Sequence, residues 1–483
     1  MTDSSRSDLS RYTDRITGFA AAKAAGLAIV VSAILALGCG EGEVRNAGGS
    51  GAVAGNAGAG GSGSGGAGAS DGGAGGDSGA AGEGGDGGTS GFAGGAAGST
   101  IDLLFFGPVE EEELFIIDTE GQVLHRWNTG TLPGMSAYLI DGGHVVRAGY
   151  LSSETFFGGG IGGVVEELDW EGNVVWSWAL ADDDFHAHHD IEPLPDGHVL
   201  VVAWELKSYE EVIDAGGDPA AVQGPLWPDA VFEYDPTTDS VVWEWHLWDH
   251  LIQEFDATKA NYGIVADHPE LVDINQPGGH EGDWTHINSI DYHPELDQIL
   301  LSVPRLHEIW VIDHSTTPAE AATHEGGLYG RGGDLLYRWG NPVLMGFGDG
   351  DRQQLFGQHD AEWIEPGLPG ADNILLFNNG RARQYSSIIE LIPPLTDQGD
   401  YDRFGPPAPL WEAAPPGLFS PVMSSAQRLP SGNTLICEGR NGRFLEMTPS
   451  GEIVWEYSGT GSVFRVHGLD SEDERLNGRN LRP

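Results

Sequence analysis

The chain has 483 residues, and its 73 acidic and 23 basic side chains give a formal net charge of −50 at neutral pH. Such a charge repels nucleic acids and anionic lipid surfaces, so neither is expected as a partner. Only two cysteines are present, Cys39 and Cys437, which excludes a cysteine-based metal site and, if Cys39 carries a lipid, any disulfide in the folded part. An anionic substrate would need cations placed locally, against the field of the whole chain.

The first 39 residues have the composition of an export signal. Scattered basic residues precede an apolar run over 24–37, which is too short to cross a bilayer and leads into the segment LALGCG. We predict a signal peptide over 1–39 with Cys39 as the lipidated residue. The protein is then exported and lipid-anchored to a membrane of a bacterial cell envelope, with plain secretion as the alternative. This anchor is the only membrane contact that we expect.

Residues 40–99 consist almost wholly of Gly, Ala, Ser and Asp. A segment of this composition cannot bury enough apolar surface to offset the entropy lost on ordering, so we predict a disordered tether. The folded domain is expected over residues 100–480. Within it, Cys437 lies in the apolar strand TLICE and is predicted to be a buried, inert thiol.

One short aromatic phrase recurs six times in the folded part. The copies are VLHRW (123–127), VVWSW (174–178), VVWEW (241–245), LLYRW (335–339), the degenerate PLWEA (409–413) and IVWEY (453–457). Most copies follow an apolar strand and a polar turn, which is the alternation of an antiparallel hairpin. Most are followed by a second hairpin, such as IEPLPDGHVLVV from Ile191 or AQRLPSGNTLICE from Ala426.

Two hairpins in each repeat make four strands, and six repeats of a four-stranded unit are typical of a β-propeller. The segment IDLLFFGP (101–108) matches the second strand of the unit, and the tail FRVHGLD (464–470) matches the first. We therefore predict an all-β fold, a six-bladed β-propeller of four-stranded antiparallel blades. Pairing of the N- and C-terminal strands in one blade is expected to close the ring without an open edge.

The first strand of each blade lines the axis of a propeller, and three of these strands begin with histidine. The segments are HAHHDIEPL with His188 and His189, DWTHINSIDY with His286, and GQHDAEWI with His359. The pattern His-Asp-x-Glu occurs in two of them, from His189 and from His359. Histidines that converge from three blades indicate a functional site on the axis rather than structural residues.

Arginines follow the second strand of several blades and can present a planar donor fork to an oxyanion. They occur in SVPRLHEI (Arg305), NNGRARQY (Arg381, Arg383) and CEGRNGRF (Arg440, Arg443). Arg305 is the strongest candidate because its own blade carries His286. The tryptophans of the loops, Trp227, Trp248, Trp284 and Trp363, could line a pocket for aromatic rings.

Together the HHD segment (188–190), THINSI (285–290), SVPR (302–305), RWGNP (338–342) and GQHDAEWI (357–364) resemble the bacterial arylsulfotransferases that do not use the nucleotide sulfate donor. The resemblance spans the predicted propeller, from about Ile101 to about Asp470, and no part of the leader. It implies transfer of a sulfuryl group from an aryl sulfate ester to a phenol through a sulfated histidine. Neither a cofactor nor a metal is implied, and the partners are small-molecule aryl sulfates and phenols.

The resemblance also implies roles for single residues. His359 matches the nucleophile, His286 and Arg305 match the sulfate-binding residues, and His189 matches a third active-site histidine, with His188 as the fallback for that position. His188, Asn288 of the THINS motif and Arg381 form the predicted substrate-binding set. Two departures stand out, because members of the family carry a disulfide and a separate N-terminal β-domain, and this chain has neither pattern.

The residue types fit sulfuryl transfer on their own chemistry. A transferring sulfuryl group spreads negative charge over its oxygens, so Arg305 and a protonated His286 would stabilise it. A neutral imidazole is a competent nucleophile, and a second histidine can give a proton to the leaving phenolate and take one from the acceptor. Asp360 or Glu362 could set the tautomer of His359.

Two other functions remain open from the residues alone. A metal-dependent hydrolase or lyase could use the clustered histidines with Asp190, Asp283 and Asp360 as ligands on the axis, although Arg305 is an unsuitable neighbour for a cation. A surface-anchored propeller that binds without turnover is the second alternative.

Overall fold

The computed structural model describes residues 99–276, 282–347, 350–401, 404 and 408–481. The predicted signal peptide (1–39) and all but the last residue of the predicted tether (40–99) lie outside the described residues. Among the residues that are described, no helix is both long enough and apolar enough to cross a membrane.

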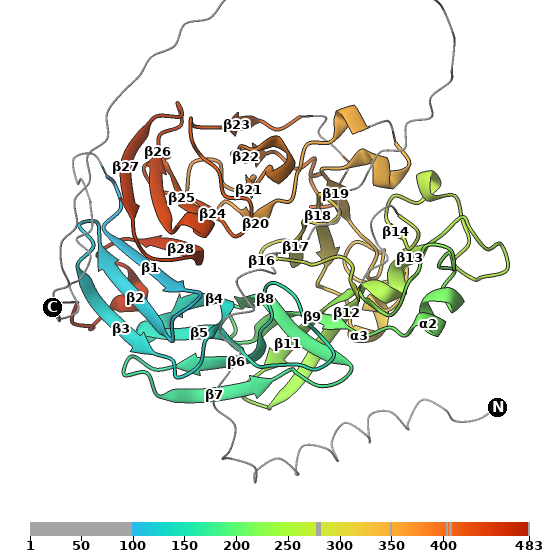
Figure 1. The fold of residues 1–483 in the computed structure, drawn as a ribbon, viewed down its shortest axis with the longest axis horizontal. Helices are drawn as coiled ribbons and strands as arrows, with labels where there is room; N and C mark the ends of the chain where they lie inside the picture. Colours follow the sequence, from blue (N-terminus) through green and yellow to red (C-terminus); the bar gives the residue numbers. More distant parts are fainter. Residues whose placement is uncertain (1–98, 277–281, 348–349, 402–403, 405–407, 482–483) are drawn as a thin grey trace, which may run out of the picture. The chain divides into compact units, whose positions relative to one another are not determined.

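Six four-stranded antiparallel sheets follow one another along the chain as the blades of a propeller, which confirms the predicted fold (Figure 1). Blade 1 contains β28 (Val463–Leu469), β1 (Leu103–Pro108), β2 (Glu113–Asp118) and β3 (Val123–Asn128). Blade 2 contains β4 (Pro133–Ile140), β5 (His144–Tyr150), β6 (Gly163–Leu168) and β7 (Val174–Ala179). Blade 3 contains β8 (Phe185–Pro193), β9 (Val199–Glu205), β11 (Asp229–Asp235) and β12 (Ser240–His246).

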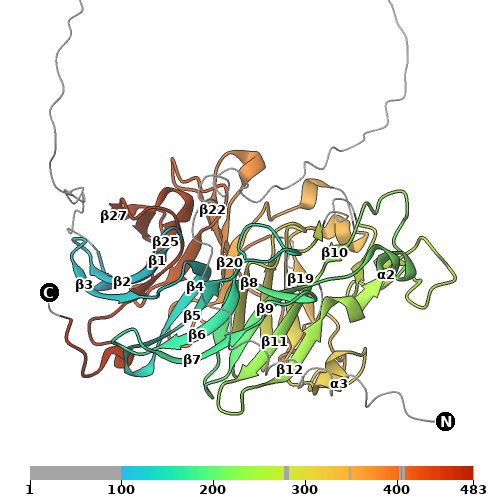
Figure 2. The same cartoon turned by 60° about the horizontal axis from the view of Figure 1, so that its bottom comes forward.

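The other three blades have the same order. Blade 4 contains β16 (Ser289–His293), β17 (Gln298–Val303), β18 (Glu308–Asp313) and β19 (Tyr337–Trp339). Blade 5 contains β20 (His359–Trp363), β21 (Ile374–Asn378), β22 (Ser387–Leu391) and β23 (Trp411–Ala413). Blade 6 contains β24 (Ser425–Arg428), β25 (Thr434–Glu438), β26 (Arg443–Met447) and β27 (Ile453–Ser458). The first-named strand of each blade lies nearest the axis, as the turned view also shows for β4, β8 and β20 (Figure 2).

The recurring aromatic phrase forms the outermost strand of every blade. In β12 the indole rings of Trp243 and Trp245 are buried and Glu244 between them is exposed, and β27 repeats this with Trp455, Glu456 and Tyr457. Alternate residues of a strand face opposite sides, so the aromatic rings cover the core while the polar residues meet solvent. This polar alternation also protects the rim strand from pairing with another chain.

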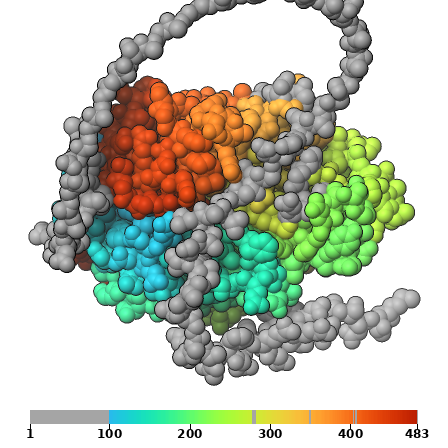
Figure 3. All heavy atoms as spheres, viewed as in Figure 1, coloured from blue at the N-terminus to red at the C-terminus, as the bar shows by residue number. Residues whose placement is uncertain are grey.

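The two ends of the propeller meet in blade 1. Strand β28 pairs antiparallel with β1 in a register that runs from Leu103 opposite Leu469 to Phe106 opposite Val466. Figure 3 shows the blue N-terminal strands against the red C-terminal part of the chain. The predicted closure of the ring is therefore confirmed.

Short elements decorate the blades. They are the helices α2 (Tyr209–Asp214) and α3 (Pro318–Ala321), the strand pairs β10 (Leu226–Trp227) with β15 (Gly282–Asp283) and β13 (Leu251–Ile252) with β14 (Val272–Asp273), and the 3-10 turns η3 (Asp141–Gly143), η4 (Leu247–His250), η5 (Val265–Asp267), η6 (Pro342–Met345), η7 (Gly350–Arg352), η8 (Arg381–Arg383), η9 (Gly439–Asn441) and η10 (Glu474–Leu476). The insertion between β9 and β11 contacts the segment before blade 4, because β10 pairs in parallel with β15. In this pairing Trp227 lies opposite Asp283.

The core lies between neighbouring blades. Between blades 3 and 4, Leu200 and Val202 of β9 belong to one buried apolar cluster with Ile299 and Leu301 of β17. Cys437 is fully buried, and burial raises the pKa of its thiol well above the ordinary value, which agrees with the predicted inert role.

Candidate active site

Backbone irregularities at the start of the inner strands aim the predicted histidines. The pairing of β8 with β9 shifts register between Ala187 and Ile191, and the pairing of β20 with β21 shifts between His359 and Glu362. His189 (φ 53°) and His286 (φ 58°) both have left-handed backbone conformations. Bulges and left-handed residues turn side chains out of the ladder, and such features concentrate at functional sites.

Hydrogen bonds between blades show that these positions correspond. Asp190, Ser289 and Asp360 each accept a backbone N–H from the inner strand of the next blade, namely from Ile290 (3.2 Å), Ala361 (3.0 Å) and Ala426 (2.9 Å). His189, Asn288 and His359 are the residues that precede these acceptors, and His286 lies two residues before Asn288.

The imidazole of His359 is held in one tautomer. Its Nδ1 lies 2.8 Å from Oδ1 of Asn379, whose amide Nδ2 donates to the carbonyl of Ser420 (2.8 Å) and to Oγ of Ser424 (3.0 Å). The carbonyl of Ser420 can only accept, so the amide orientation is determined and Nδ1 of His359 must donate to Asn379. The lone pair of His359 is then on Nε2, which receives the backbone N–H of Met423 at 3.3 Å. Burial lowers the pKa of His359 to about 4, so the ring is neutral at neutral pH.

A second relay orients His189. Nε2 of His188 donates to Oδ1 of Asp229 (2.7 Å), which leaves Nδ1 of His188 to accept from Nδ1 of His189 (2.8 Å). The lone pair of His189 is therefore on Nε2. Burial lowers the pKa of His189 well below its ordinary value, and the nearby positive charges of His286 and Arg305 add to this effect.

The third group contains the cations. Oδ2 of Asp283 lies 2.5 Å from Nδ1 of His286 and 3.1 Å from Nη2 of Arg305, and Oδ1 of Asp283 accepts from Nε1 of Trp204 at 2.9 Å. Burial alone would raise the pKa of Asp283, but the charges and hydrogen bonds of His286 and Arg305 hold it well below the usual range. An ionised Asp283 thus fixes an imidazole and a guanidinium side by side.

These three groups form one cluster, which we call the histidine cluster: His189, His286, His359 and Arg305. The rings of His189 and His286 meet edge to face with centroids 4.4 Å apart. Gly160 lies against His189, since a Cβ on Gly160 would come within 2.0 Å of the ring. The cluster offers a neutral nucleophilic nitrogen beside fixed positive charge, which suits transfer of an anionic group.

Comparison with known proteins agrees with this chemistry. Residues 100–391, more than half of the chain, match the family described as arylsulfotransferase (ASST). The chain belongs to the arylsulfotransferase family. Membership supports aryl sulfotransferase activity as the general function, with small-molecule aryl sulfates and phenols as its substrates.

None of the curated proteins compared matches the chain. Among solved structures, a protein of unknown function from Bacteroides caccae is 11% identical over 76% of this chain and 98% of its own, with a TM-score of 0.43. The virginiamycin B lyase of Staphylococcus aureus is 9% identical over 74% of this chain and 82% of its own, with a TM-score of 0.36. At these TM-scores the likenesses carry no argument about function.

The other predicted site residues of this arylsulfotransferase family member lie around the cluster. His188 is buried behind His189 and stacks on Trp204 with centroids 4.2 Å apart, so its geometry favours positioning His189 over touching a substrate. Asn288 is buried and donates its amide to the carbonyl of Gln358 (2.9 Å), next to His359. Arg381 lies in the exposed turn η8.

Two expectations about the site need correction. Neither Asp360 nor Glu362 sets the tautomer of His359; Asn379 does. Asp360 instead lies 2.6 Å from Nε of Arg465, an arginine on β28 whose Nη2 also lies 2.7 Å from Oδ2 of Asp190. Asp190 and Asp360 already pair with Arg465 and accept backbone N–H groups, and Asp283 pairs with His286 and Arg305. These three carboxylates are therefore poorly suited to bind the axial metal ion that the sequence left open.

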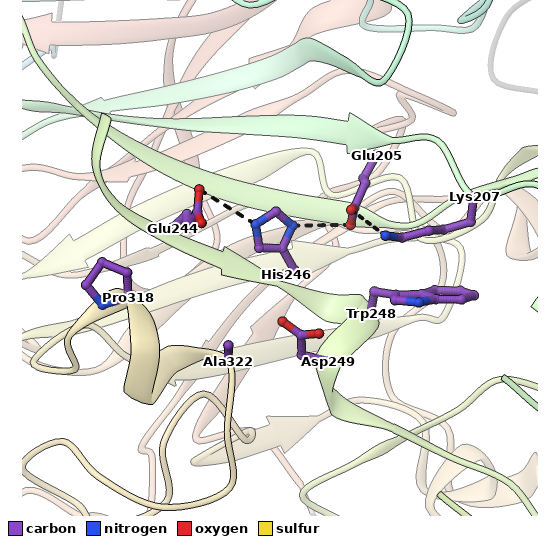
Figure 4. A pocket seen from close by; sticks show the side chains of 8 residues that line it. All are labelled: Glu205, Lys207, Glu244, His246, Trp248, Asp249, Pro318 and Ala322. Atoms are coloured by element: carbon purple, nitrogen blue, oxygen red, sulfur yellow. Dashed lines mark hydrogen bonds and ion pairs between the residues drawn. The ribbon is translucent and has the colours of Figure 1, made fainter. Parts of the chain in front are cut away.

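The tryptophans are the second correction. Trp227, Trp284 and Trp363 are buried in apolar clusters. Trp248 lines a cavity of about 280 Å³ between β12, η4 and α3. The other lining residues are Glu205, Lys207, Glu244, His246, Asp249, Pro318 and Ala322 (Figure 4). None of these residues belongs to the histidine cluster.

Sequence reasoning missed Asn379 and Asp229, and it named Asp283 only as a possible metal ligand. Asn379 follows strand β21, directly before the turn that carries Arg381, and Asp229 begins strand β11. Both residues lie at the end of a strand, and Arg305 lies just beyond one. This position at a strand end is the sequence feature that could have identified them.

Proposed function

We propose that this protein transfers a sulfuryl group from an aryl sulfate ester to a phenol through a sulfated His359, without a nucleotide sulfate donor. The observation that carries the proposal is the hydrogen bond from Nδ1 of His359 to an amide oxygen of determined orientation, which puts the lone pair on Nε2. That lone pair accepts a long hydrogen bond of 3.3 Å from the N–H of Met423, which the sulfur of the donor must displace. The neighbouring charges of His286 and Arg305 support it.

In the first half-reaction, Nε2 of His359 attacks the sulfur of the aryl sulfate. The N–S bond forms as the bond from sulfur to the aryl oxygen breaks, and both electrons of that bond leave with the aryl oxygen. Arg305 and the imidazolium of His286, both held by Asp283, stabilise the sulfuryl oxygens. His286 gives its Nε2 proton to the departing oxygen.

In the second half-reaction, the phenol acceptor loses its proton to His286 and its oxygen attacks the sulfur. The N–S bond breaks, and both its electrons return to Nε2 of His359, so the cycle is balanced in atoms and protons. His189, which is oriented by His188 and Asp229, packs edge to face against His286 and helps to position the imidazole that takes this proton.

The test uses 4-nitrophenyl sulfate and the purified protein after treatment with a chelator. We expect release of nitrophenol that is stimulated by an added phenol, and label from a radioactive donor that stays on the peptide containing His359 when no acceptor is present. Tight binding of the donor without release would instead favour the binding propeller. Release that depends on restored metal would favour the metal-dependent hydrolase.

We also propose export and lipid attachment at Cys39, which rests on the apolar run before LALGCG. Mass spectrometry of the mature protein would then find an N-terminal peptide that begins at Cys39 and carries the mass of a diacylglyceryl group. A mature N-terminus at another residue would contradict this proposal.

A further inference from the structure

Three side chains outside the histidine cluster converge on one point at the edge of blades 3 and 4. Nδ1 of His250, at the end of η4, lies 2.8 Å from Oδ1 of Asp334, and Nδ1 of His324 lies 2.7 Å from the same oxygen. His324 and Asp334 belong to the connection between β18 and β19. Their three potential ligand atoms all lie within 4.8 Å of one another.

The hydrogen bonds of His250 leave a lone pair aimed at this point. Nε2 of His250 lies 2.9 Å from the carbonyl oxygen of Ala321, which can only accept, so Nε2 carries a hydrogen. In the neutral ring, the lone pair on Nδ1 then faces the carboxylate of Asp334, which is also an acceptor. This fully buried contact is satisfied only when a cation, either a proton or a metal ion, lies between the two.

The surrounding backbone holds the three groups in place. The N–H of Gly333 donates to the carbonyl of Thr323 (3.0 Å), which brings the next residues, His324 and Asp334, together. Trp245 stacks on His250 with centroids 5.8 Å apart and donates to the carbonyl of Gly333 (2.7 Å). A Cβ on Gly333 would lie 2.5 Å from Nε2 of His250, so the close approach requires glycine here.

The group borders a pocket whose lining includes acidic and histidine side chains. His324 is 57% exposed and lines a pocket of about 420 Å³ together with Asp214, Asp249 and His268. Trp248 and Asp249 also line the cavity of Figure 4, so the two pockets adjoin. The net charge of −50 further favours the approach of a cation.

We propose that His250, His324 and Asp334 bind a divalent transition metal ion, with zinc as the best match to two imidazoles and one carboxylate. Zinc takes such ligands at about 2.0–2.2 Å in a tetrahedral arrangement, which sets the ligand atoms about 3.3 Å apart. The two histidine nitrogens, at 2.8 and 2.7 Å from Oδ1 of Asp334, would each move away from that oxygen by about half an ångström. The fourth position faces the pocket beside His324 and takes water or a ligand atom.

The test titrates chelator-treated full-length protein with Zn²⁺ by calorimetry and with Co²⁺ by visible absorption. We expect one equivalent to bind at this site, with affinity reduced at least about a hundredfold in His324→Ala and in Asp334→Asn. His324 is exposed, so its replacement leaves the fold intact. His268→Ala is the matched control, because His268 lines the same pocket and pairs with Glu270 instead.

A second control addresses the other histidine–carboxylate group of the described residues, Asp196, His198 and Glu233. Zinc affinity that is lost in His198→Ala but unchanged in His324→Ala would overturn the proposal, and so would the absence of zinc binding. An additional equivalent that is lost only in His198→Ala would leave it standing. Phenol release should survive chelation whichever result is found, so this proposal and the proposed function fail separately.

Discussion

The histidine cluster and the buried carboxyl groups of Glu192 and Glu362 come from the same inner strands, yet they differ in charge and environment. In the His-Asp-x-Glu segments, His189 and His359 point to the cluster, whereas Glu192 and Glu362 lie three residues further along the axis. Burial raises the pKa of Glu192 and of Glu362, and nearby carboxylates, among them Asp291, add to this effect. Between the two ends, Arg465 binds Asp190 and Asp360.

The three named residues of the His-Asp-x-Glu segment therefore have three different surroundings. The histidine enters the cluster, the aspartate links its blade to the next blade and to Arg465, and the glutamate lies among other buried carboxylates. Asp283 holds one histidine, His286, and Arg305 side by side in the cluster, although the chain as a whole is strongly acidic. Substitutions at four positions and one pH profile test this separation.

The largest effect is expected from His359→Asn, which removes the nucleophilic nitrogen. Turnover of an aryl sulfate should fall by at least about 10³-fold, and the thermal unfolding midpoint should stay close to that of the unchanged protein. His467→Asn is the matched control, because His467 lies on the inner strand β28 and its ring packs against Phe105 and Tyr138 instead of the cluster. Equal loss of turnover in both variants would contradict the proposal that the reaction takes place at the histidine cluster.

Arg465→Met should act on stability. It leaves Asp190 and Asp360 buried without their counter-ion, and breaking a buried ion pair costs about 3–5 kcal/mol. Denaturant unfolding measures the loss. Adding Asp190→Asn and Asp360→Asn to this variant should recover much of it, and an Arg465→Met protein as stable as the original would contradict the role given to this residue.

Arg305→Leu removes a fixed charge from the cluster. We expect turnover to fall by about 10²–10³, as for loss of one oxyanion donor. Arg443→Leu is the control, because Arg443 pairs with Glu438 and Glu456 on blade 6. If Arg305→Leu transfers sulfuryl groups as fast as the control, the guanidinium does not contact the transferring group.

Asn379 is a positioning residue, and Asn379→Leu should lower turnover by about 10–100-fold because Nδ1 of His359 loses its acceptor. The informative variant is Asn379→Asp. A carboxylate would still accept from Nδ1, but it would stabilise the protonated ring and raise the pKa of His359. The acid limb of the pH profile should therefore move to higher pH, a shift that a purely structural role would not produce.

The smallest effect concerns pH in the unchanged protein. Because burial lowers the pKa of His359 to about 4, the ring is neutral and nucleophilic above that pH and protonated below it. Turnover should be insensitive to this group from neutral pH down to about 5, and should then fall about tenfold per unit below 4. A fall that begins near pH 6.5 would mean that the ring is not desolvated.

The architecture could be predicted from sequence because it depends on local patterns. Six aromatic strands with period-2 alternation and their turns are sufficient for the blade count. The repeated His-Asp pair also identified His189 and His359. The partners of these residues could not be found in this way, since Asn379 and Asp229 reach the histidines through pairings between strands and blades. The assignment of Asp360 to His359 was wrong because neighbours in sequence point away from each other in a strand.

Strand β28 follows the other strands of the propeller in the described sequence, and it carries Arg465. Asp190 and Asp360 are synthesised long before it, so during synthesis the partly assembled axis holds two carboxylates without their cation. When β28 adds to β1, the same step pairs the open edge of blade 1 and neutralises the axis. The strand that closes the ring is therefore also the strand that gives these two carboxylates their cation.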